Sequence, residues 1–427
     1  MWHISKYLIF AEDKIDKNKI NCVNLFTGSF IKINLEDFLL LFNYKKLNEN
    51  QEILKKFIEE KIIINFDEYD FWLKRAKINS DSIDKLSLSI CPTLDCNFNC
   101  PYCFEKHRQG KMSLEVQEDI INFINKINNK NKLKKLNITW FGGEPLLNIE
   151  IIDSLSQKII SFSEKNNIQY FSNIITNGYL LNQKNADILA KAKVNKYQIT
   201  LDGVSEMHNK TRCLKNGLPS FNKIVDNLKN TKIIGHINIR QNIYNDNKNN
   251  IEELKNFLER LKKISNNNIS YYFGEVCLND NLEENNKLSM IESLNFSKIK
   301  LSQSDIFIPK IKFLACGAQR KNTFTIDELG NLYKCRDQAG TLKYSFGNIR
   351  NWNDNIISYP NNFNIFIDTI EMINDKDCIE CAWFPVCAGG CPKYRLFYKK
   401  KCIPYKGYEE EFINKIAEKY NNFLTHK

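Results

Sequence analysis

Residues 86–103 read LSLSICPTLDCNFNCPYC, a short strand pattern followed at once by three closely spaced cysteines. Apolar residues alternate with serines over 86–90, which predicts a β-strand. Cys96, Cys100 and Cys103 then follow with the spacing CxxxCxxC. Three thiolates on one tight loop cannot complete a tetrahedral zinc site unaided. They can hold three irons of a [4Fe–4S] cluster and leave the fourth iron open to a small molecule. A structural metal loop with a distant fourth ligand is the alternative.

Strand and helix patterns alternate on the C-terminal side of this loop. Further strands are predicted at 136–141, 168–176, 196–201, 233–239 and 269–276. Segments between them, such as 113–127 and 251–261, carry helical spacing of apolar residues. Repeated strand–helix units predict a parallel sheet. About six units fit a barrel better than a flat, doubly wound sheet, and a barrel carries its chemistry on the loops after the strands. The expected fold class is therefore α/β, a partial (β/α)6 barrel.

Two further regions flank this core, which we expect to span residues 86–305. Residues 1–85 have the size and element order of a winged-helix-like α+β unit. Its strands are predicted at 7–10, 20–24, 30–33 and 62–64, its helices at 35–42 and 51–60, and a polar linker at 79–84. Residues 306–427 form a cysteine-rich third region. A hairpin is predicted there, from strands 323–326 and 331–334.

Composition narrows the class of protein. The chain has 427 residues, 43% of them hydrophobic, which suits two or three folded domains. It contains no apolar stretch long enough to span a bilayer and no export signal, so we expect a cytoplasmic protein without a membrane partner. The net charge of +11 is spread along the chain and predicts a solvated surface, with a surface that attracts an acidic partner as the alternative. Fourteen cysteines in a reducing compartment point to metal or catalysis rather than disulfides.

The cysteine loop, with Tyr102 before its last cysteine, resembles the signature of radical S-adenosylmethionine (SAM) enzymes. A second match comes after the next predicted strand, where residues 140–145 read WFGGEP. By this resemblance Gly142, Gly143 and Glu144 receive the SAM amino group. Glycine lets a backbone approach a ligand closely, and a carboxylate accepts hydrogen bonds from an ammonium group.

Three weaker matches follow in chain order. Thr176 and Asn177 end the third strand and resemble a TNG segment near the ribose and methionyl part of SAM. Residues 200–203 (TLDG) resemble the S/T-L-D-G segment, and 208–212 (HNKTR) resemble an HDxxR pattern with Asn in place of Asp. Thr200 and Arg212 are thereby candidates for the SAM carboxylate, which a guanidinium suits bidentately. A structural threonine and a surface arginine are the alternatives.

The cysteines of the third region also form an ordered string. Cys316 and Cys335 belong to a C-x13-G-x4-C pattern, and residues 378–391 carry CxxCx5CxxxC, followed by Cys402. Two structural zinc sites are one interpretation. The string resembles the SPASM domain, which holds two auxiliary [4Fe–4S] clusters. The resemblance implies that Cys378, Cys381, Cys387 and Cys402 ligate one cluster, and that Cys316, Cys335 and Cys391 ligate the other.

The second auxiliary site lacks an obvious fourth ligand. Some relatives have a cysteine six residues before the first, but here that position is Lys310. Either Cys277 completes the site or one iron stays open and could bind a substrate thiolate. Asp337 is a candidate catalytic base, although it is shifted by one position from the acid of some relatives. An ordinary turn aspartate is the alternative. The remaining cysteines are expected to be structural thiols: Cys22, Cys91 and Cys213.

Together these resemblances imply a radical SAM/SPASM enzyme that matures a ribosomally made peptide. Its cofactors would be SAM and three [4Fe–4S] clusters, and its product a thioether or other cross-link. Its partners would be a precursor peptide with a leader segment, and a reductant such as flavodoxin or ferredoxin, but no nucleic acid. Residues 1–85 would be a PqqD-like unit that binds the leader by strand addition. An anaerobic sulfatase maturase is one alternative, and a non-catalytic, metal-stabilised scaffold is another.

Overall fold

The computed structural model describes residues 2–276, 308–352, 360–371, 373, 375–398, 400–403 and 405–425. The chain divides into two compact units. Unit 1 is drawn from Met1–Asp81, Met290–Arg320 and Phe366–Lys427, and unit 2 from Ser82–Ser289 and Lys321–Ile365. Each unit therefore combines segments that are far apart in the sequence.

Unit 2 is built on one large, mainly parallel sheet. Six parallel strands form its main part: β6 (Lys85–Ile90), β7 (Lys135–Trp140), β8 (Gln169–Thr176), β9 (Val194–Thr200), β10 (His236–Ile243) and β11 (Asn268–Glu275). Among these six strands, neighbours in the sheet are also consecutive strands of the chain. A doubly wound sheet would reverse its strand order at a switch point. The sequential order is that of a partial barrel, so the prediction of an α/β fold of this kind is confirmed.

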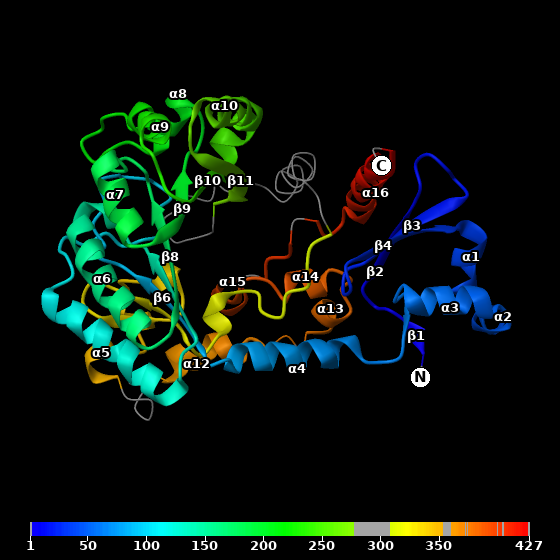
Figure 1. Cartoon of the computed structure of the whole chain (residues 1–427). Coiled ribbons are helices and arrows are strands. Elements are labelled where there is room, and N and C mark those ends of the chain that lie inside the picture. The colour runs from blue at the N-terminus through cyan, green and yellow to red at the C-terminus, as the bar shows by residue number, and fades with distance from the viewer. Residues whose placement is uncertain are drawn as a thin grey trace. The chain divides into compact units, whose positions relative to one another are not determined.

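Helices connect these strands and cover one side of the sheet (Figure 1). They are α5 (Leu114–Asn131), α6 (Ile149–Lys165), α7 (Gln183–Lys191), α8 (Ser205–Thr211), α9 (Phe221–Asn230) and α10 (Ile251–Ile264). Ser113 caps α5 by accepting a hydrogen bond from the Val116 N–H. The apolar faces of the helices pack on the strands, as with Phe123 of α5 and Leu155 of α6, both fully buried with Trp140 of β7. This core fixes where the loops after the strands begin.

Three strands extend the sheet beyond β6. They are β12 (Thr323–Ile326), β13 (Asn331–Tyr333) and β14 (Gly347–Asn348). The predicted hairpin is confirmed as the antiparallel pair β12–β13. The parallel pairing of β12 with β6 is an additional finding. The hairpin therefore belongs to unit 2, and its turn lies at the same end of the sheet as the loop after β6.

In unit 1, a three-stranded antiparallel sheet is covered on both faces. Its strands are β2 (Leu8–Glu12), β3 (Lys19–Asn24) and β4 (Ser29–Asn34), in the order β2-β3-β4. Side chains of one face, including Ile9 and Val23, pack with Trp383 and with Phe412 of α16 (Glu409–Thr425). Those of the other face, including Cys22 and Ile33, pack with Phe38 and Phe57 of the helices α1 (Leu35–Leu40) and α3 (Gln51–Glu59). Both faces of this sheet are therefore buried, and its two edges lie along β2 and β4.

The rest of unit 1 is short elements and one long helix. Strands β1 (His3–Ile4) and β5 (Ile63–Ile64) pair with each other, and α2 (Tyr44–Glu49) precedes α3. The helix α4 (Glu68–Asp81) includes residues 79–81, so their assignment to a linker was wrong. Trp72 of this helix is buried against Phe384, and its indole N–H donates a hydrogen bond to the Lys312 carbonyl at 2.7 Å. The C-terminal helices of this unit are α13 (Lys376–Ile379), α14 (Phe384–Cys387) and α15 (Pro392–Phe397), whereas α12 (Pro360–Asp368) begins in unit 2 and ends in unit 1. Within the described residues, none of the helices could cross a membrane.

Candidate active site and cysteine pocket

The predicted cluster loop leaves the carboxyl end of β6. Cys96 is buried, and Cys100 and Cys103 are half-buried. The Phe98 N–H donates to Cys96 Sγ at 3.4 Å, and the Cys103 N–H donates to the Cys100 carbonyl at 3.1 Å. A backbone donor aimed at a sulfur stabilises that sulfur as a thiolate, which is the form that binds iron.

Burial dominates the electrostatics of these thiols. It raises the pKa of Cys96 and Cys100 above the ordinary value and that of Cys103 to about 12. The bare thiols therefore stay protonated at neutral pH, and a bound metal centre would be needed to hold them as thiolates. No three His, Cys, Asp or Glu side chains in the described part of the chain stand close enough to hold one metal ion. A cubane gives each cysteine its own iron, so its ligands are spread more widely than those of a single ion.

The turn after β7 packs directly against the loop that carries Cys96. A Cβ on Gly142 would come within 2.2 Å of the Thr93 carbonyl oxygen, and one on Gly143 within 2.2 Å of the Asp95 carbonyl oxygen. Gly142 also has a φ of +115°, which side chains rarely allow. The two glycines are therefore required for the close approach of two backbones, whatever else they bind.

Glu144 joins the ends of β7 and β8. Its buried carboxylate accepts hydrogen bonds from Thr176 Oγ1 and from the Asn177 N–H, both at 2.7 Å, and from the Leu146 N–H at 3.0 Å. Burial raises the pKa of Glu144 in spite of these hydrogen bonds. Asn177 Nδ2 in turn donates to Asn97 Oδ1 of the cysteine loop at 2.8 Å. The structure thus brings together Glu144, Thr176 and Asn177, three residues predicted at strand ends, through hydrogen bonds to the Glu144 carboxylate.

A second buried group surrounds Tyr102 of the cysteine loop. The Tyr102 hydroxyl donates a hydrogen bond to Asp202 Oδ2 and accepts one from Arg212 Nη1 at 2.8 Å. Asn242 Nδ2 also donates to this hydroxyl at 3.3 Å. Burial raises the pKa of Asp202, although the guanidinium and the phenol act in the opposite direction. Thr200, the other candidate for the SAM carboxylate, is buried at the end of β9, two residues before Asp202.

Sequence reasoning missed two acids of this site. Asp202 stands in the TLDG segment but was assigned no role, and nothing in the sequence marks its contact with Tyr102. Glu105 follows the cysteine loop, and burial, with Glu144 nearby, raises its pKa to about 8. Only its place two residues after Cys103 could have pointed to it.

Two of these side chains keep unsatisfied polar atoms. Arg212 Nε and Glu105 Oε2 are both buried without a hydrogen-bond partner. After burial, which is the largest cause, Arg212 lowers and Glu105 raises the pKa of both Cys100 and Cys103, so both side chains lie near these thiols. Buried donors and acceptors normally find partners. One orphaned guanidinium N–H and one orphaned carboxyl oxygen beside the cysteines fit a ligand with both a carboxylate and an ammonium group.

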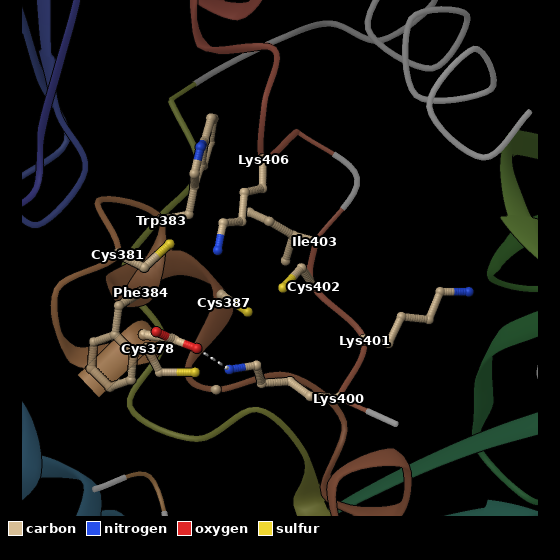
Figure 2. A pocket seen from close by; sticks show the side chains of 12 residues that line it. Cys378, Cys381, Trp383, Phe384, Cys387, Lys400, Lys401, Cys402, Ile403 and Lys406 are labelled. Atoms are coloured by element: carbon tan, nitrogen blue, oxygen red, sulfur yellow. Dashed lines mark ion pairs between the residues drawn. The ribbon is translucent and has the colours of Figure 1, made fainter. Parts of the chain in front are cut away.

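Four of the C-terminal cysteines surround a single pocket in unit 1. Cys378, Cys381, Cys387 and Cys402 line it together with Lys400, as Figure 2 shows. The pocket has about 360 Å³ of empty space, part of it open to solvent. These are the four cysteines predicted to ligate one cluster. After the effect of burial, the other three raise the pKa of the Cys387 thiol, so their sulfurs are near neighbours.

The second predicted group is divided between the units. Cys316 and Cys391 are exposed residues of unit 1, whereas Cys335 is a half-buried residue of unit 2, so their grouping stays a prediction. Cys277, its possible fourth ligand, lies outside the described residues. Asp337 lies half-buried in a short 3-10 turn of unit 2, directly after the hairpin. Its role as a base likewise stays a prediction.

The remaining cysteines sit in different surroundings. Cys22 on β3 and Cys91 after β6 are buried, and Cys213 is half-buried. Burial raises the pKa of Cys22 to about 12. Cys91 packs against Gly142, since a Cβ there would approach the Cys91 Cβ to 3.1 Å. These positions agree with packing roles for Cys22 and Cys91.

Comparison with known proteins agrees with this geometry. The model of the Radical SAM superfamily matches residues 90–282, the part that carries the buried site. A cysteine-type anaerobic sulfatase-maturating enzyme of Clostridium novyi is 27% identical over 380 residues, which cover 78% of this chain and 96% of that enzyme.

Two solved structures share the fold. Native anSMEcpe with bound AdoMet and the Cp18Cys peptide superposes with a TM-score of 0.60 at 21% identity, covering 80% of this chain and 100% of that one. Streptococcus suis SuiB bound to S-adenosylmethionine superposes with a TM-score of 0.50 at 17% identity, covering 91% of this chain and 95% of SuiB. The matched motif region, the sequential parallel sheet and the buried site at its carboxyl end have one explanation: the chain belongs to the radical SAM superfamily and is an enzyme that uses SAM and a [4Fe–4S] cluster.

Proposed function

We propose that this enzyme modifies a peptide by radical chemistry and forms a thioether or another cross-link in it. The observation that carries the proposal is the pocket lined by Cys378, Cys381, Cys387 and Cys402 in the same chain as the buried site of unit 2. Four convergent thiols suit an auxiliary [4Fe–4S] cluster. Such a cluster would accept the electron that a substrate radical loses when it is oxidised to a cross-linked product.

The residues of unit 2 would bind and orient SAM. Cys96, Cys100 and Cys103 would ligate the cluster that it approaches, and the cofactors would supply a 5′-deoxyadenosyl radical that abstracts hydrogen from the substrate. Arg212 would contribute its unpartnered Nε to the SAM carboxylate, and Glu105 its unpartnered oxygen to the ammonium group. Glu144 would position Thr176 and Asn177 rather than contact SAM itself, because its oxygens already accept hydrogen bonds from these two residues. The closed surroundings would keep water from the reacting atoms.

We further propose that residues 1–85 bind the leader segment of the peptide at an edge of the β2-β3-β4 sheet. Both faces of this sheet are already covered, by α16 and Trp383 on one side and by α1 and α3 on the other. A partner would therefore bind this sheet through the backbone N–H and C=O groups of its edge strands, β2 and β4. An extended peptide can add to such an edge as a further strand.

The test is an anaerobic reconstitution with iron and sulfide, followed by reduction and addition of SAM and a cysteine-containing peptide. We expect about twelve irons per chain, 5′-deoxyadenosine, and a peptide that loses two hydrogens but keeps its sulfur. Hydrogen exchange should show new protection of β2 or β4 amides when the leader is added. Zinc in place of iron, or no deoxyadenosine from fully loaded protein, would contradict the proposal.

One alternative has support of its own. The Clostridium novyi relative is a sulfatase-maturating enzyme, and 96% of its length is matched. Oxidation of a cysteine to formylglycine removes the sulfur from the peptide, whereas a thioether keeps it. Mass spectrometry of the product therefore separates the two reactions in a single experiment.

A further inference from the structure

An arginine donates a hydrogen bond to one of the four cysteines of the pocket. Arg395 of α15 places Nη2 at 3.0 Å from Cys378 Sγ. The same guanidinium donates from Nη2 at 3.0 Å and from Nε at 3.3 Å to the Gly389 carbonyl. Its side chain is only 13% exposed, so solvent screens this charge little.

The Gly389 carbonyl is held at a fixed position. Gly389 and Gly390 have φ values of +78° and +80°, and Ala388 before them is also left-handed at +51°. A Cβ on Gly390 would come within 2.7 Å of the Lys401 carbonyl oxygen. This tight turn therefore gives the guanidinium a rigid acceptor and fixes its direction toward the sulfur.

Charges of both signs surround Cys378. Asp375 Oδ2 lies 3.6 Å from Cys378 Sγ, and this oxygen is paired with Lys400 Nζ at 2.5 Å and with Arg395 Nη1 at 3.6 Å. Asp377 is 85% exposed and lies 3.8 Å from Lys400 Nζ, so water screens most of its charge. The acid nearest the sulfur is thus shared between two cations, and Arg395 alone of these cations donates to the sulfur.

We infer that Arg395 sets the reduction potential of the cluster that Cys378 would help to hold. A hydrogen bond from a cation withdraws electron density from the thiolate and so weakens its donation to iron. The reduced cluster carries one more negative charge than the oxidised cluster, so a nearby positive charge stabilises it more. Both effects raise the potential, and hydrogen bonds to sulfur, net charge and exposure are known determinants of cluster potentials. The inference rests on the proposed function, and it makes this cluster the better electron acceptor.

A purely structural role makes a different prediction. If Arg395 only tied α15 to the Gly389 turn, its loss would change stability and iron content but leave the potential of any cluster that remained. Lysine could keep the charge but has no planar fork with which to reach Gly389 and Cys378 together. The potential, rather than the activity, therefore separates the two roles.

The experiment is an EPR-monitored redox titration of the full-length chain with Cys96→Ala, Cys100→Ala, Cys103→Ala, Cys316→Ala and Cys335→Ala. In this background the proposed cluster of the pocket is the one that remains. Arg395→Gln should lower its reduction equilibrium constant about tenfold, a shift of about 59 mV to more negative potential. Arg395→Lys should lie between this value and that of the parent. The control is Lys376→Gln, which removes an 83% exposed cation on α13 whose ion-pair partner is Glu380 rather than a sulfur.

The outcomes distinguish the inference from its premise. Equal potentials in the parent, Arg395→Gln and Arg395→Lys chains, at equal iron content, would overturn the inference and leave the cluster site standing. A shift in Lys376→Gln as large as that in Arg395→Gln would overturn it too, because the sulfur contact would then be irrelevant. If Arg395→Gln loses its iron, the potential of Arg395→Lys decides. A parent chain without an iron–sulfur signal would instead refute the proposed cluster site itself.

Discussion

Replacement of Gly143 by alanine should detach the cysteine loop from the turn that supports it. The new Cβ would lie 2.2 Å from the Asp95 carbonyl oxygen, 2.5 Å from its carbonyl carbon and 2.6 Å from the Leu94 carbonyl oxygen. All three are backbone atoms, so no side chain can swing aside. Asp95 O also accepts a hydrogen bond from the Glu144 N–H at 2.8 Å, which must lengthen as the oxygen retreats. Cys96 is the next residue and moves with it.

The cost can be worked from these contacts. Ordinary van der Waals contact begins near 3.4 Å, so the Asp95 oxygen must retreat by about 1.2 Å. Overpacking of this kind costs about 1–3 kcal/mol. A buried N–H left without its acceptor costs about 1–3 kcal/mol more. A misplacement of about 1 Å lowers the efficiency of a positioned site on the order of 100-fold. We expect reconstituted Gly143→Ala to bind SAM at least tenfold more weakly and to form little deoxyadenosine.

Equilibrium dialysis with labelled SAM and an iron count give the two readouts. The matched control is Gly407→Ala, because Gly407 has a φ of +91° but nothing within 4 Å of its Cβ position. That variant introduces backbone strain in unit 1 without a collision and should bind SAM normally. Wild-type SAM affinity and iron content in Gly143→Ala would refute the reasoning, since the loop would then tolerate the displacement.

Three further predictions concern separate parts of the molecule. Asp202→Asn removes the carboxylate that Arg212 reaches through the Tyr102 hydroxyl, and should lower the free energy of unfolding by about 1–3 kcal/mol in urea titrations. In that background Arg212→Met should cost less than it does in the wild type, whereas additive costs would contradict the coupling. Burial alone would raise the pKa of Asp13, but hydrogen bonds, first that from Lys32 at 2.6 Å, hold it well below its usual range. The ionised Asp13 carboxylate therefore stabilises the fold above the unfolded-state pKa of about 3.9, and this contribution is lost as the pH falls further. Asp13→Asn should lower the free energy of unfolding by about 2 kcal/mol at neutral pH, and this loss should shrink below about pH 4. A loss that did not depend on pH would refute this. Trp72→Ala should cost about 3–5 kcal/mol in thermal melts and lower the iron content of the pocket, while an unchanged melting temperature would mean that its contacts are dispensable.

Much of unit 2 could be predicted from sequence because its strands and helices have strong local patterns. The six parallel strands were expected within a few residues of their observed bounds, and a parallel order follows from helical crossovers. The pairing of β12 with β6 could not be predicted in this way, because it joins residues more than two hundred positions apart. Nothing in the pattern of a short hairpin specifies the strand beside which it lies.

The candidate site divides in the same manner. Motif residues such as Glu144 and Arg212 could be chosen through the resemblance to the radical SAM motifs, since a motif fixes residue types at set positions. Their partners could not, because the contact of Tyr102 with Asp202 joins two different loops. Gly142 and Gly143 were expected to contact a ligand. The structure adds a second reason for glycine at these positions, because both pack against the backbone of the loop after β6.

The packing of unit 1 also decides how leader binding can be tested. Deletion of residues 1–85 would remove Ile9 and Val23 from the core that they share with Trp383, and Tyr7 and Trp72 from the core around Phe384. Trp383 and Phe384 lie between Cys381 and Cys387, so the deletion would expose apolar surface beside the cysteine pocket. A truncated chain that failed to act on a peptide would then report the loss of the pocket as readily as the loss of a leader site. Exchange protection at β2 or β4 in the intact chain reports leader binding alone, because it leaves these shared cores in place.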